Sequence, residues 1–470
     1  MSIYSQRPRR AGPDSRAHRF VNTLAALAGV LAFVAASGAR ADVVKDWDII
    51  AASTITPAAS VTLPPPVTEA EQRPIFQVDL ATLHVAIYDA VNAIDRRFEP
   101  YAIVLHAGTR GASEEAAAVG AAYNVLKGLF PNRSVIYQHA FDTYVAAAAG
   151  DPAKARGLAI GAEVAGGILA LRQNDGRMAA VSYATTGQPG DWVPGPPPLL
   201  YTYIPFMKPF AVRSAAQFRA PGPAALTSQR YADDFNETKT MGAAVNSPRT
   251  AEMSDLALFY SESSATYFPR NWRQFDSDSQ SIADNARLMA LIWIINADTQ
   301  LACVESKYHY RFWRPRTAVP QADLDGNPET IADATWASFI ATPNHPEYPA
   351  LHACNGGSFA ETLRQFYGTD QLNLTLTSTK AVLHPTHQFT TTGEMLTETA
   401  NARVYGGVHF RKSTLDGVTL GRRTARWISR HYFRPLHERD EHEYRDHDRS
   451  DADHDDADHD DANRGDDDRD

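Results

Sequence analysis

Apolar residues recur every three or four positions along most of the chain, which is the spacing of one face of an α-helix. A clear early case is 77–95, where Leu80, Leu83, Ile87 and Val91 follow this spacing. The same pattern predicts helices at 114–130, 134–149, 151–173, 281–310, 351–367 and 415–432. No run of alternating apolar and polar residues stands out. We therefore predict an all-α fold, a helical bundle with long proline-rich loops.

The segment 187–223 interrupts this helical pattern. It contains seven prolines between Pro189 and Pro209, together with Trp192 and several tyrosines. Proline has no backbone N–H and breaks a helix, so the segment cannot be helical. A long excursion of this kind inside a compact domain is either the wall or lid of a cleft or a scaffold loop wrapped over the core.

The two ends of the chain differ in charge from the middle. Residues 1–41 contain six arginines and one aspartate, and an apolar run at 20–36 precedes Ala39-Arg40-Ala41. This pattern predicts a signal peptide cleaved after Ala41; the alternatives are a retained membrane anchor and twin-arginine export. Residues 438–470 contain 17 acidic residues and five arginines. They predict a disordered acidic tail rather than a metal scavenger, and deleting them should leave activity unchanged.

The middle of the chain, 42–437, is nearly neutral although the whole chain has a net charge of -10. We expect one helical domain there, with its catalytic part at about 250–437. A neutral domain does not favour a nucleic-acid partner. No segment after the leader approaches a spanning length, so we expect an exported protein, periplasmic or extracellular, that has no membrane contact after cleavage and can form oligomers. Two cysteines, Cys303 and Cys354, permit one disulfide, with two free buried thiols as the alternative.

The first cluster with chemical potential is KYHYRFWRP, from Lys307 to Pro315. Lys307 and Arg314 lie seven positions apart, which is two turns along nearly the same helix face, and Pro315 marks where the helix must end. An arginine fork and a lysine point charge suit an anion with several oxygens. Alone, such a pair is more often a surface or ion-paired feature.

Two further clusters follow. HPEYPALH runs from His345 to His352, and we place His352 at a helix start, where the free N–H groups favour anions. A histidine there can act as acid or base, or be a structural histidine. In RVYGGVH, Arg403 and His409 lie six positions apart, which places them about 120° from each other around a straight helix. The two glycines between them let the backbone bend and bring both side chains together.

In this order the clusters resemble the three-part signature of the superfamily of vanadium-dependent haloperoxidases and type 2 phosphatidic acid phosphatases: K-x6-RP, P-S-G-H and S-R-x5-H. The segment with YHYRFWRP, and HVAIYDAVNAID near the start of the domain, are similar to the bacterial haloperoxidase-like branch. The resemblance runs from about 42 to 435 and is most specific in the last third. It implies a helical bundle of the acid phosphatase and vanadium-dependent haloperoxidase type.

The resemblance also implies roles. His409 would bind vanadium directly, or act as the nucleophile of a phosphatase. His352 would be the acid–base partner on the opposite apical side. Lys307, Arg314 and Arg403 would neutralise the equatorial oxygens of the vanadate cofactor, and Lys307 would also polarise the bound peroxide.

The chain departs from the family pattern at several positions. Ala350 and Leu351 stand in the oxyanion-binding loop where the family has serine and glycine, and Ala402 replaces the serine of the third motif. Ser413 stands where phosphatases carry an aspartate that orients the nucleophile, which weakens the phosphatase interpretation. His345 occupies a position where relatives that oxidise bromide have histidine, so we expect bromide or iodide.

The sequence therefore predicts a vanadate-dependent haloperoxidase that oxidises bromide or iodide with hydrogen peroxide to hypohalous acid. Its partners would be small molecules: peroxide, halide and an organic acceptor. One alternative is an acid phosphatase acting on phosphomonoesters through a phosphohistidine. Another is a non-catalytic oxyanion-binding protein. We also hypothesise that Cys303 and Cys354 are bridged, because each flanks a cluster that must meet the other in space.

Overall fold

The computed structural model describes residues 42–56, 64–106, 108–275 and 279–436. The predicted signal peptide and acidic tail lie outside these residues. The described part contains fourteen α-helices and one two-stranded sheet. Their bounds are α2 Val43–Ile55, α3 Glu69–Gln72, α4 Phe76–Asp95, α5 Glu114–Leu129, α6 Ser134–Ala147, α7 Pro152–Leu171, α8 Gln229–Met241, α9 Ala251–Phe259, α10 Ser264–Trp272, α11 Ile282–Tyr310, α12 Pro315–Ala318, α13 Leu351–Tyr367, β1 Gln371–Thr377, β2 Thr386–Thr391, α14 Thr392–Tyr405 and α15 Arg411–His431.

The helical fold predicted from the apolar spacing is confirmed, and the sheet is the one departure from it. β1 and β2 form an antiparallel hairpin in which Leu374 faces Phe389. The alternation of leucines in QLNLTLT is its sequence signal, and Leu374 and Leu376 are buried. Two short strands cannot be stable alone, so the hairpin depends on the helices that it covers.

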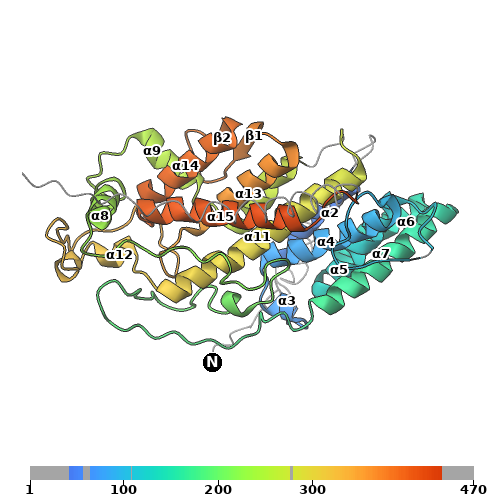
Figure 1. Cartoon of the computed structure of the whole chain (residues 1–470), viewed down its shortest axis with the longest axis horizontal. Coiled ribbons are helices and arrows are strands. Elements are labelled where there is room, and N and C mark those ends of the chain that lie inside the picture. The colour runs from blue at the N-terminus through green and yellow to red at the C-terminus, as the bar shows by residue number, and fades with distance from the viewer. Residues whose placement is uncertain (1–41, 57–63, 107, 276–278, 437–470) are drawn as a thin grey trace, which may run out of the picture.

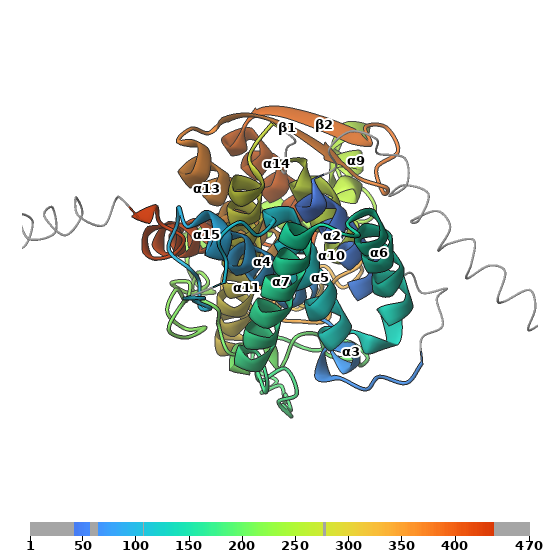
Figure 2. The same cartoon turned by 90° about the vertical axis from the view of Figure 1, so that its right-hand side faces the viewer.

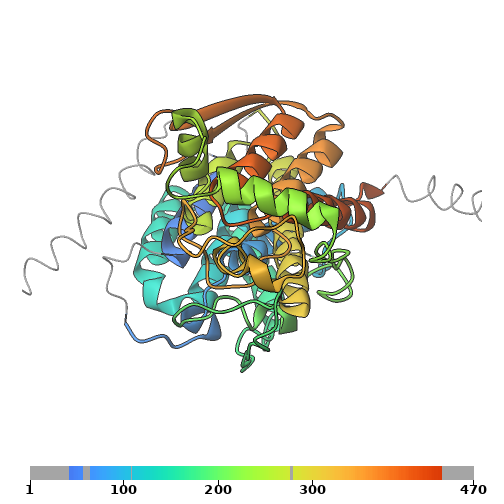
Figure 3. The ribbon, with the colours of Figure 1, turned by 90° about the vertical axis from the view of Figure 1, so that its left-hand side faces the viewer.

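The helices form two groups that share α11 (Figure 1). α4, α5 and α7 pack together with α6 at one end of the molecule, and Figure 2 looks onto this end with the hairpin at the top. α13, α14 and α15 form the second group around the other half of α11. The opposite end, facing the viewer in Figure 3, carries α8 and the loops around α12.

α11 is the central element of the fold. It has 29 residues, and among the described helices it has the length and apolar composition that could cross a membrane, so the expectation that no later segment approaches a spanning length is wrong. Its most apolar stretch is 94% buried inside the protein, as in a core helix. A disulfide between Cys303 and Cys354 joins α11 to α13, which confirms the hypothesised bridge.

Two glycines fix the position of α13. Gly417 and Gly421 of α15 lie directly against the backbone of α13, and a Cβ at either position would collide with the carbonyl oxygen of Ala350 or Cys354. This close packing holds the start of α13 rigidly. That start carries His352, one of the predicted site residues.

Candidate functional site

Lys307 lies in the last turn of α11 and is fully buried. Its Nζ donates to the carbonyl oxygens of Pro346, Glu347 and Pro349, at 3.1 Å for Pro346 and 2.9 Å for Glu347. An ammonium group has three N–H donors, so the loop between His345 and Ala350 uses all of them. Lys307 therefore fastens the first cluster to the second.

The route from Lys307 to Arg314 differs from the expected one. α11 ends at Tyr310 because Arg311 adopts a left-handed conformation with φ of 49°, so Arg314 does not lie on a continuous helix with Lys307. Residues 190–192 of the proline-rich segment pair with 311–313 in an extended arrangement and draw them away from the helix. The prediction that the helix continues to the proline after Arg314 is wrong, although both cations still reach the same place.

Arg314 is the N-cap residue of α12 and is fully buried. Its Nε donates to the carbonyl oxygen of His345 at 3.0 Å, and its Nη2 lies 3.0 Å from His345 Nδ1. Its Nη1 donates to the carbonyl oxygen of Val408 at 2.7 Å and lies 3.1 Å from His409 Nε2. Arg314 therefore holds the second and third clusters together.

The third cluster bends as the sequence predicts. α14 ends at Tyr405, and Gly407 has a φ of 72°, which turns the chain so that Arg403 and His409 both point into the protein. Arg403 is 2% exposed, and its Nη1 donates to the carbonyl oxygen of Tyr260 at 2.8 Å. Its Nε has no hydrogen-bond partner among the described residues. No acidic side chain in that part of the chain forms a salt bridge with it.

Two contacts set the protonation of His409. A guanidinium group can only donate, so His409 Nε2 accepts from Arg314 and carries no proton. The proton is then on Nδ1, which donates to Glu347 Oε1 at 2.8 Å. The same oxygen accepts from the backbone N–H of Phe410 at 3.0 Å. His409 is thus a neutral imidazole whose Nε2 lone pair suits a bond to a metal or to phosphorus.

His352 is the second residue of α13, at the helix start that the sequence predicts. It is partly exposed, whereas Lys307, Arg314 and His409 are buried. Its Nε2 lies 3.5 Å from Ser264 Oγ, and its ring centroid is 5.8 Å from that of Phe268. The cluster is therefore open to solvent on the side of His352.

Ala350 and Leu351 form the junction between the loop and α13. Both are buried, and Ala350 donates its backbone N–H to the carbonyl oxygen of Ser413 at 3.0 Å. As the N-cap residue, Ala350 offers no side-chain cap to the helix. Neither side chain can donate a hydrogen bond to an oxyanion, and a missing bond to a charged group costs roughly 1.5–3 kcal/mol.

The charges of the site are not balanced. Arg314 and Arg403 are cations, burial lowers the pKa of Lys307 well below its usual value, and Glu347 is the one carboxylate among the described residues that faces them. Burial lowers the pKa of Arg314 to about 9 and that of Arg403 to about 10, so both stay charged at neutral pH. Burying unpaired cations is costly. The cluster is therefore suited to a bound anion with several oxygens.

The three histidines of the site are neutral at neutral pH. Burial, followed by the nearby cations, holds the pKa of each well below its usual value. His345 Nδ1 lies 3.0 Å from both Arg314 Nη2 and the carbonyl oxygen of Pro346. The structure thus brings together all the residues that the sequence singled out for this site, although their roles remain predictions.

Three further residues lie at this site that were not predicted from the sequence. Glu347 lies within HPEYP, and its signal was a carboxylate in a loop that otherwise faces cations. Tyr260 contributes only its carbonyl oxygen to Arg403, and Ser264 reaches His352 from α10. Neither of these has a sequence signal, because a backbone carbonyl is common to every residue and α10 lies far away along the chain.

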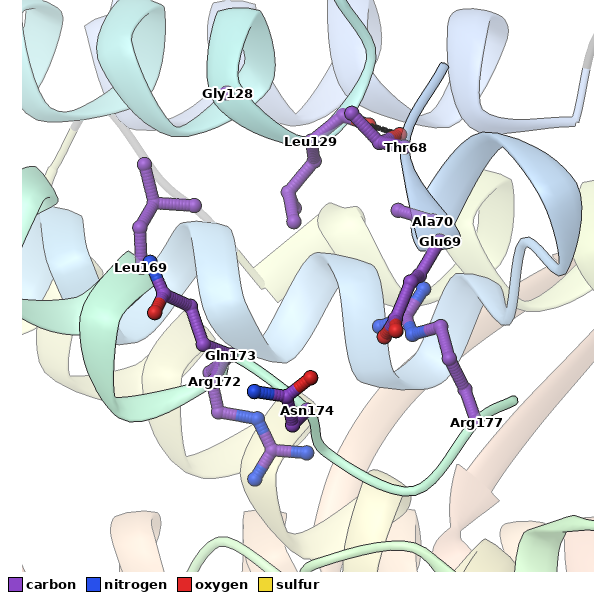
Figure 4. Close-up of a pocket in the computed structure, with 10 residues that line it drawn as sticks. All are labelled: Thr68, Glu69, Ala70, Gly128, Leu129, Leu169, Arg172, Gln173, Asn174 and Arg177. Carbon is purple, nitrogen blue, oxygen red and sulfur yellow. Dashed lines mark hydrogen bonds between the residues drawn. The ribbon is translucent and has the colours of Figure 1, made fainter. Parts of the chain in front are cut away.

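A separate pocket of about 450 Å³ lies between α3, α5 and α7 (Figure 4). Its lining includes Glu69, Arg172 and Arg177 and none of the predicted site residues. Both arginines form salt bridges with Asp175. Its charged lining is therefore largely satisfied, unlike that of the cluster around Lys307. Elsewhere in the described residues, no group of three or more His, Cys, Asp or Glu side chains is placed to hold a metal ion.

Comparisons with known proteins point to one group. Residues 287–438 match the family model of the VCPO second helical-bundle domain. A stretch of 95 residues is 32% identical to the vanadium chloroperoxidase of Curvularia inaequalis, and it spans 18% of this chain and 15% of that protein.

The fold is similar to two solved bacterial structures. The first bacterial vanadium-dependent iodoperoxidase superposes with a TM-score of 0.68 at 21% identity, covering 84% of this chain and 98% of that one. An apo-type bacterial vanadium-dependent chloroperoxidase gives a TM-score of 0.59 at 17% identity, covering 78% and 95%. At these identities the likeness establishes the fold alone.

Proposed function

Because the chain belongs to the superfamily of vanadium-dependent haloperoxidases and type 2 phosphatidic acid phosphatases, we propose that it is a vanadate-dependent haloperoxidase. The observation that carries this proposal is the unbalanced charge of its buried cluster. Arg403 is nearly inaccessible and has no carboxylate partner among the described residues, while His409 presents an unprotonated Nε2 to the same cluster. A tetrahedral oxyanion supplies the missing negative charge, and His409 supplies the ligand.

Each residue of the cluster would have a different role in holding vanadate. Arg314 and Arg403 would neutralise its oxygens and His409 would ligate the metal through Nε2. Lys307 holds the loop in place through its N–H groups. When bound, vanadate supplies Lewis-acid activation of hydrogen peroxide toward a halide without a change in its own oxidation state.

His352 is placed to move protons. It is the partly exposed histidine of the cluster, and its low pKa keeps it unprotonated at neutral pH. It can therefore take a proton from incoming hydrogen peroxide and return one to the leaving water. We propose bromide or iodide as the halide, because His345 lies directly against Arg314.

A specific contact favours phosphomonoester hydrolysis as the second candidate. Glu347 accepts from His409 Nδ1 and so supplies the carboxylate that Ser413 lacks. His409 Nε2 could then attack phosphorus, with His352 protonating the leaving alkoxide. The absence of a hydroxyl at Ala350 supports a third candidate, an oxyanion-binding protein without turnover.

We propose that the protein acts outside the cytoplasm on small molecules. The disulfide between Cys303 and Cys354 supports export, because such bonds persist in oxidising compartments. The nearly neutral domain supports a function without nucleic acid.

The test is a paired assay on purified protein. After reconstitution with vanadate, halogenation of a phenol dye is followed with peroxide and bromide or iodide, and phosphate release from a chromogenic ester is measured without vanadate. We expect activity in the first assay. Activity confined to the second would reject the haloperoxidase in favour of the phosphatase, and none in either would favour the oxyanion-binding protein.

His409→Ala is the control for this assay, because it removes the metal ligand and nucleophile. The variant should be inactive in both assays while its melting temperature stays close to that of the wild type. Halogenation that survives in His409→Ala would arise from free vanadate or peroxide and not from this site.

A further inference from the structure

The direction in which Arg403 points depends on a single contact. Among the described residues, the carbonyl oxygen of Tyr260 is the one hydrogen-bond acceptor of Arg403, at 2.8 Å from Nη1, and the buried Nε has no partner there. A guanidinium group presents its donors in a rigid fork on a flexible side chain. The position of the Tyr260 carbonyl therefore decides where the remaining donors of Arg403 point.

Tyr260 also contacts α14 at a second point. It is the C-cap residue of α9 and is buried. Burial keeps the pKa of Tyr260 well above its usual value, so its hydroxyl stays protonated, and it donates to Glu398 Oε1 at 3.1 Å. Glu398 lies five residues before Arg403 on α14, which is about 7.5 Å along the helix axis. One tyrosine thus joins α14 at two places, and Arg403 is one of them.

The β-hairpin holds the acceptor of this hydroxyl. His387 of β2 has its Nδ1 2.7 Å from the same oxygen of Glu398. The ring of His387 stacks on that of Phe259, the last residue of α9, with centroids 4.1 Å apart. The hairpin, α9 and α14 therefore meet at Glu398, and Figure 1 shows all three at the top of the molecule.

A carbonyl oxygen has a particular advantage as the partner of Arg403. It accepts a hydrogen bond and so orients the guanidinium, but it carries no net charge. A carboxylate at the same place would orient Arg403 equally well and would also cancel the positive charge that an oxyanion needs. The contact with Tyr260 therefore fixes the direction of Arg403 and leaves its charge available.

We propose that Tyr260 and Glu398 are positioning residues for Arg403. The hydrogen bond between them holds the Tyr260 carbonyl, and this carbonyl aims the guanidinium at the bound oxyanion. The inference rests on the proposed function, since it takes vanadate as that anion. It adds two residues outside the three sequence motifs, and it connects the β-hairpin to the site through His387.

The test is a double-mutant cycle on vanadate affinity, measured by calorimetric titration. Tyr260→Phe removes the hydroxyl and keeps the ring, and it is made in the wild type and in Arg403→Met. Tyr137→Phe is the matched control. Tyr137 is also buried, and its hydroxyl donates to Thr54 Oγ1 at 3.0 Å between α6 and α2.

We expect Tyr260→Phe to weaken vanadate binding about 5-fold in the wild type, as for the loss of one hydrogen bond. In Arg403→Met the same change should leave the affinity unaltered, because the residue through which it acts is gone. Tyr137→Phe should lower the melting temperature to a similar extent and bind vanadate as the wild type does. An equal loss of affinity with and without Arg403, or no loss in Tyr260→Phe, would overturn the positioning role.

Two substitutions of Glu398 test the same hydrogen bond from its other end. Glu398→Gln keeps an oxygen that accepts from Tyr260, so it should retain most of the affinity for vanadate. Glu398→Leu removes the acceptor and should reproduce the loss seen in Tyr260→Phe. Equal losses in the two Glu398 variants would contradict a role for this hydrogen bond.

Halogenation of a phenol dye is measured on the same proteins, so that the two proposals can fail separately. Vanadate affinities that are coupled between Tyr260 and Arg403 in a protein that does not halogenate would reject the haloperoxidase and leave the positioning role in place. Halogenation together with uncoupled affinities would reject the positioning role alone.

Discussion

Two clusters of buried charge in this protein differ in how their charges are matched. In the group of α4, α5 and α7, Arg177 pairs with Asp79 at 2.9 Å and with Asp175 at 3.0 Å, and Arg172 joins Asp175 at 3.3 Å. Two cations face two carboxylates. In the group around α11, the cations Arg314 and Arg403 lie with Lys307, whose pKa burial lowers, and among the described residues Glu347 is the one carboxylate that faces them.

The pKa shifts follow this difference. Burial acts to lower the pKa of Arg177, but Asp79 and Asp175 more than offset it, and the pKa is raised. Burial lowers the pKa of Arg403 to about 10, with no carboxylate to offset it. A matched cluster, in which buried cations pair with carboxylates, stabilises the fold. An unmatched cluster, in which buried cations lack carboxylate partners, carries a desolvation cost that a bound anion can offset. Breaking each cluster in turn tests this distinction.

The largest effect is expected in the matched cluster. Arg177→Met leaves Asp79 buried without its ion pair, so the free energy of unfolding should fall by about 3–5 kcal/mol. Denaturant titration measures it. Arg97→Met is the control, since Arg97 is exposed and its pairs with Asp95 and Asp284 should be worth less than about 1 kcal/mol. Equal effects in the two variants would contradict a structural role for the matched cluster.

The opposite result is expected in the unmatched cluster. Arg403→Met removes a buried cation that has no carboxylate partner among the described residues, so the ligand-free protein should keep its stability or gain some. Vanadate affinity should fall about 100-fold, or about 2.7 kcal/mol, because a charged hydrogen-bond donor is lost. Calorimetric titration measures the affinity.

Thermal denaturation of the same variant gives an independent readout. Vanadate at 100 times its Kd should stabilise the wild type by about 2.7 kcal/mol, and the same concentration should hardly stabilise Arg403→Met. A ligand-free Arg403→Met protein that unfolds far more easily than the wild type would mean that Arg403 supports the fold.

Much of the fold was predictable, because the spacing of apolar residues within a segment is enough to recognise a helix. The spacing of apolar residues located α13 at 351–367 and α4 within one residue of its start, and the glycines before His409 indicated a bend. The turn at Arg311 was not predictable. It depends on residues 190–192, which lie more than a hundred positions earlier and pair with the chain there.

Most residues of the site were also predictable from the sequence. Its cations and histidines belong to motifs with fixed spacing, so the sequence identified Arg314 and His409 and the structure brings them into contact. Glu347 was not identified from the sequence, because its role depends on a loop that folds back onto His409. The tautomer of His409 also needed coordinates, since it follows from which neighbour donates.

Glu347 is the one carboxylate of the unmatched cluster among the described residues, so its replacement tests how that cluster holds a ligand. Glu347→Gln keeps the shape of the side chain but weakens the hydrogen bond from His409 Nδ1. Supporting groups of this kind change metal affinity by about 10–100-fold, so vanadate should bind more weakly by a factor in that range. Calorimetry measures the affinity, and the low-field proton resonance of His409 Nδ1–H should move upfield in the ligand-free variant.

The control for this variant places a carboxylate at a neighbouring position instead. Ser413 lies beside the same loop, where its carbonyl oxygen accepts from Ala350, and it contacts Glu347. Glu347→Gln combined with Ser413→Asp should recover part of the affinity. Wild-type affinity in Glu347→Gln alone would show that Arg314 is sufficient to orient His409.

The same carboxylate predicts a dependence on pH. Burial raises the pKa of Glu347 to about 7 in the folded protein, from an unperturbed value of 4.5. Its stabilising contribution is therefore fully present below pH 4.5 and is lost as pH rises through 7. The unfolding free energy of the wild type relative to Glu347→Gln should fall between these limits, as measured by denaturant titration across the range. A difference that stays constant with pH would mean that folding does not shift the pKa of Glu347.

The smallest effect is expected where the chain departs from its relatives. Ala350→Ser returns a hydroxyl to the N-cap of α13, beside the unmatched cations. A serine oxygen at this position accepts a backbone N–H of the first turn, which should stabilise the protein by about 1 kcal/mol. Its proton remains available for an oxyanion, so vanadate affinity should rise several-fold, or about 1 kcal/mol. Higher stability with unchanged affinity would show that the hydroxyl serves the helix alone, and that the two arginines already satisfy the ligand at this end of α13.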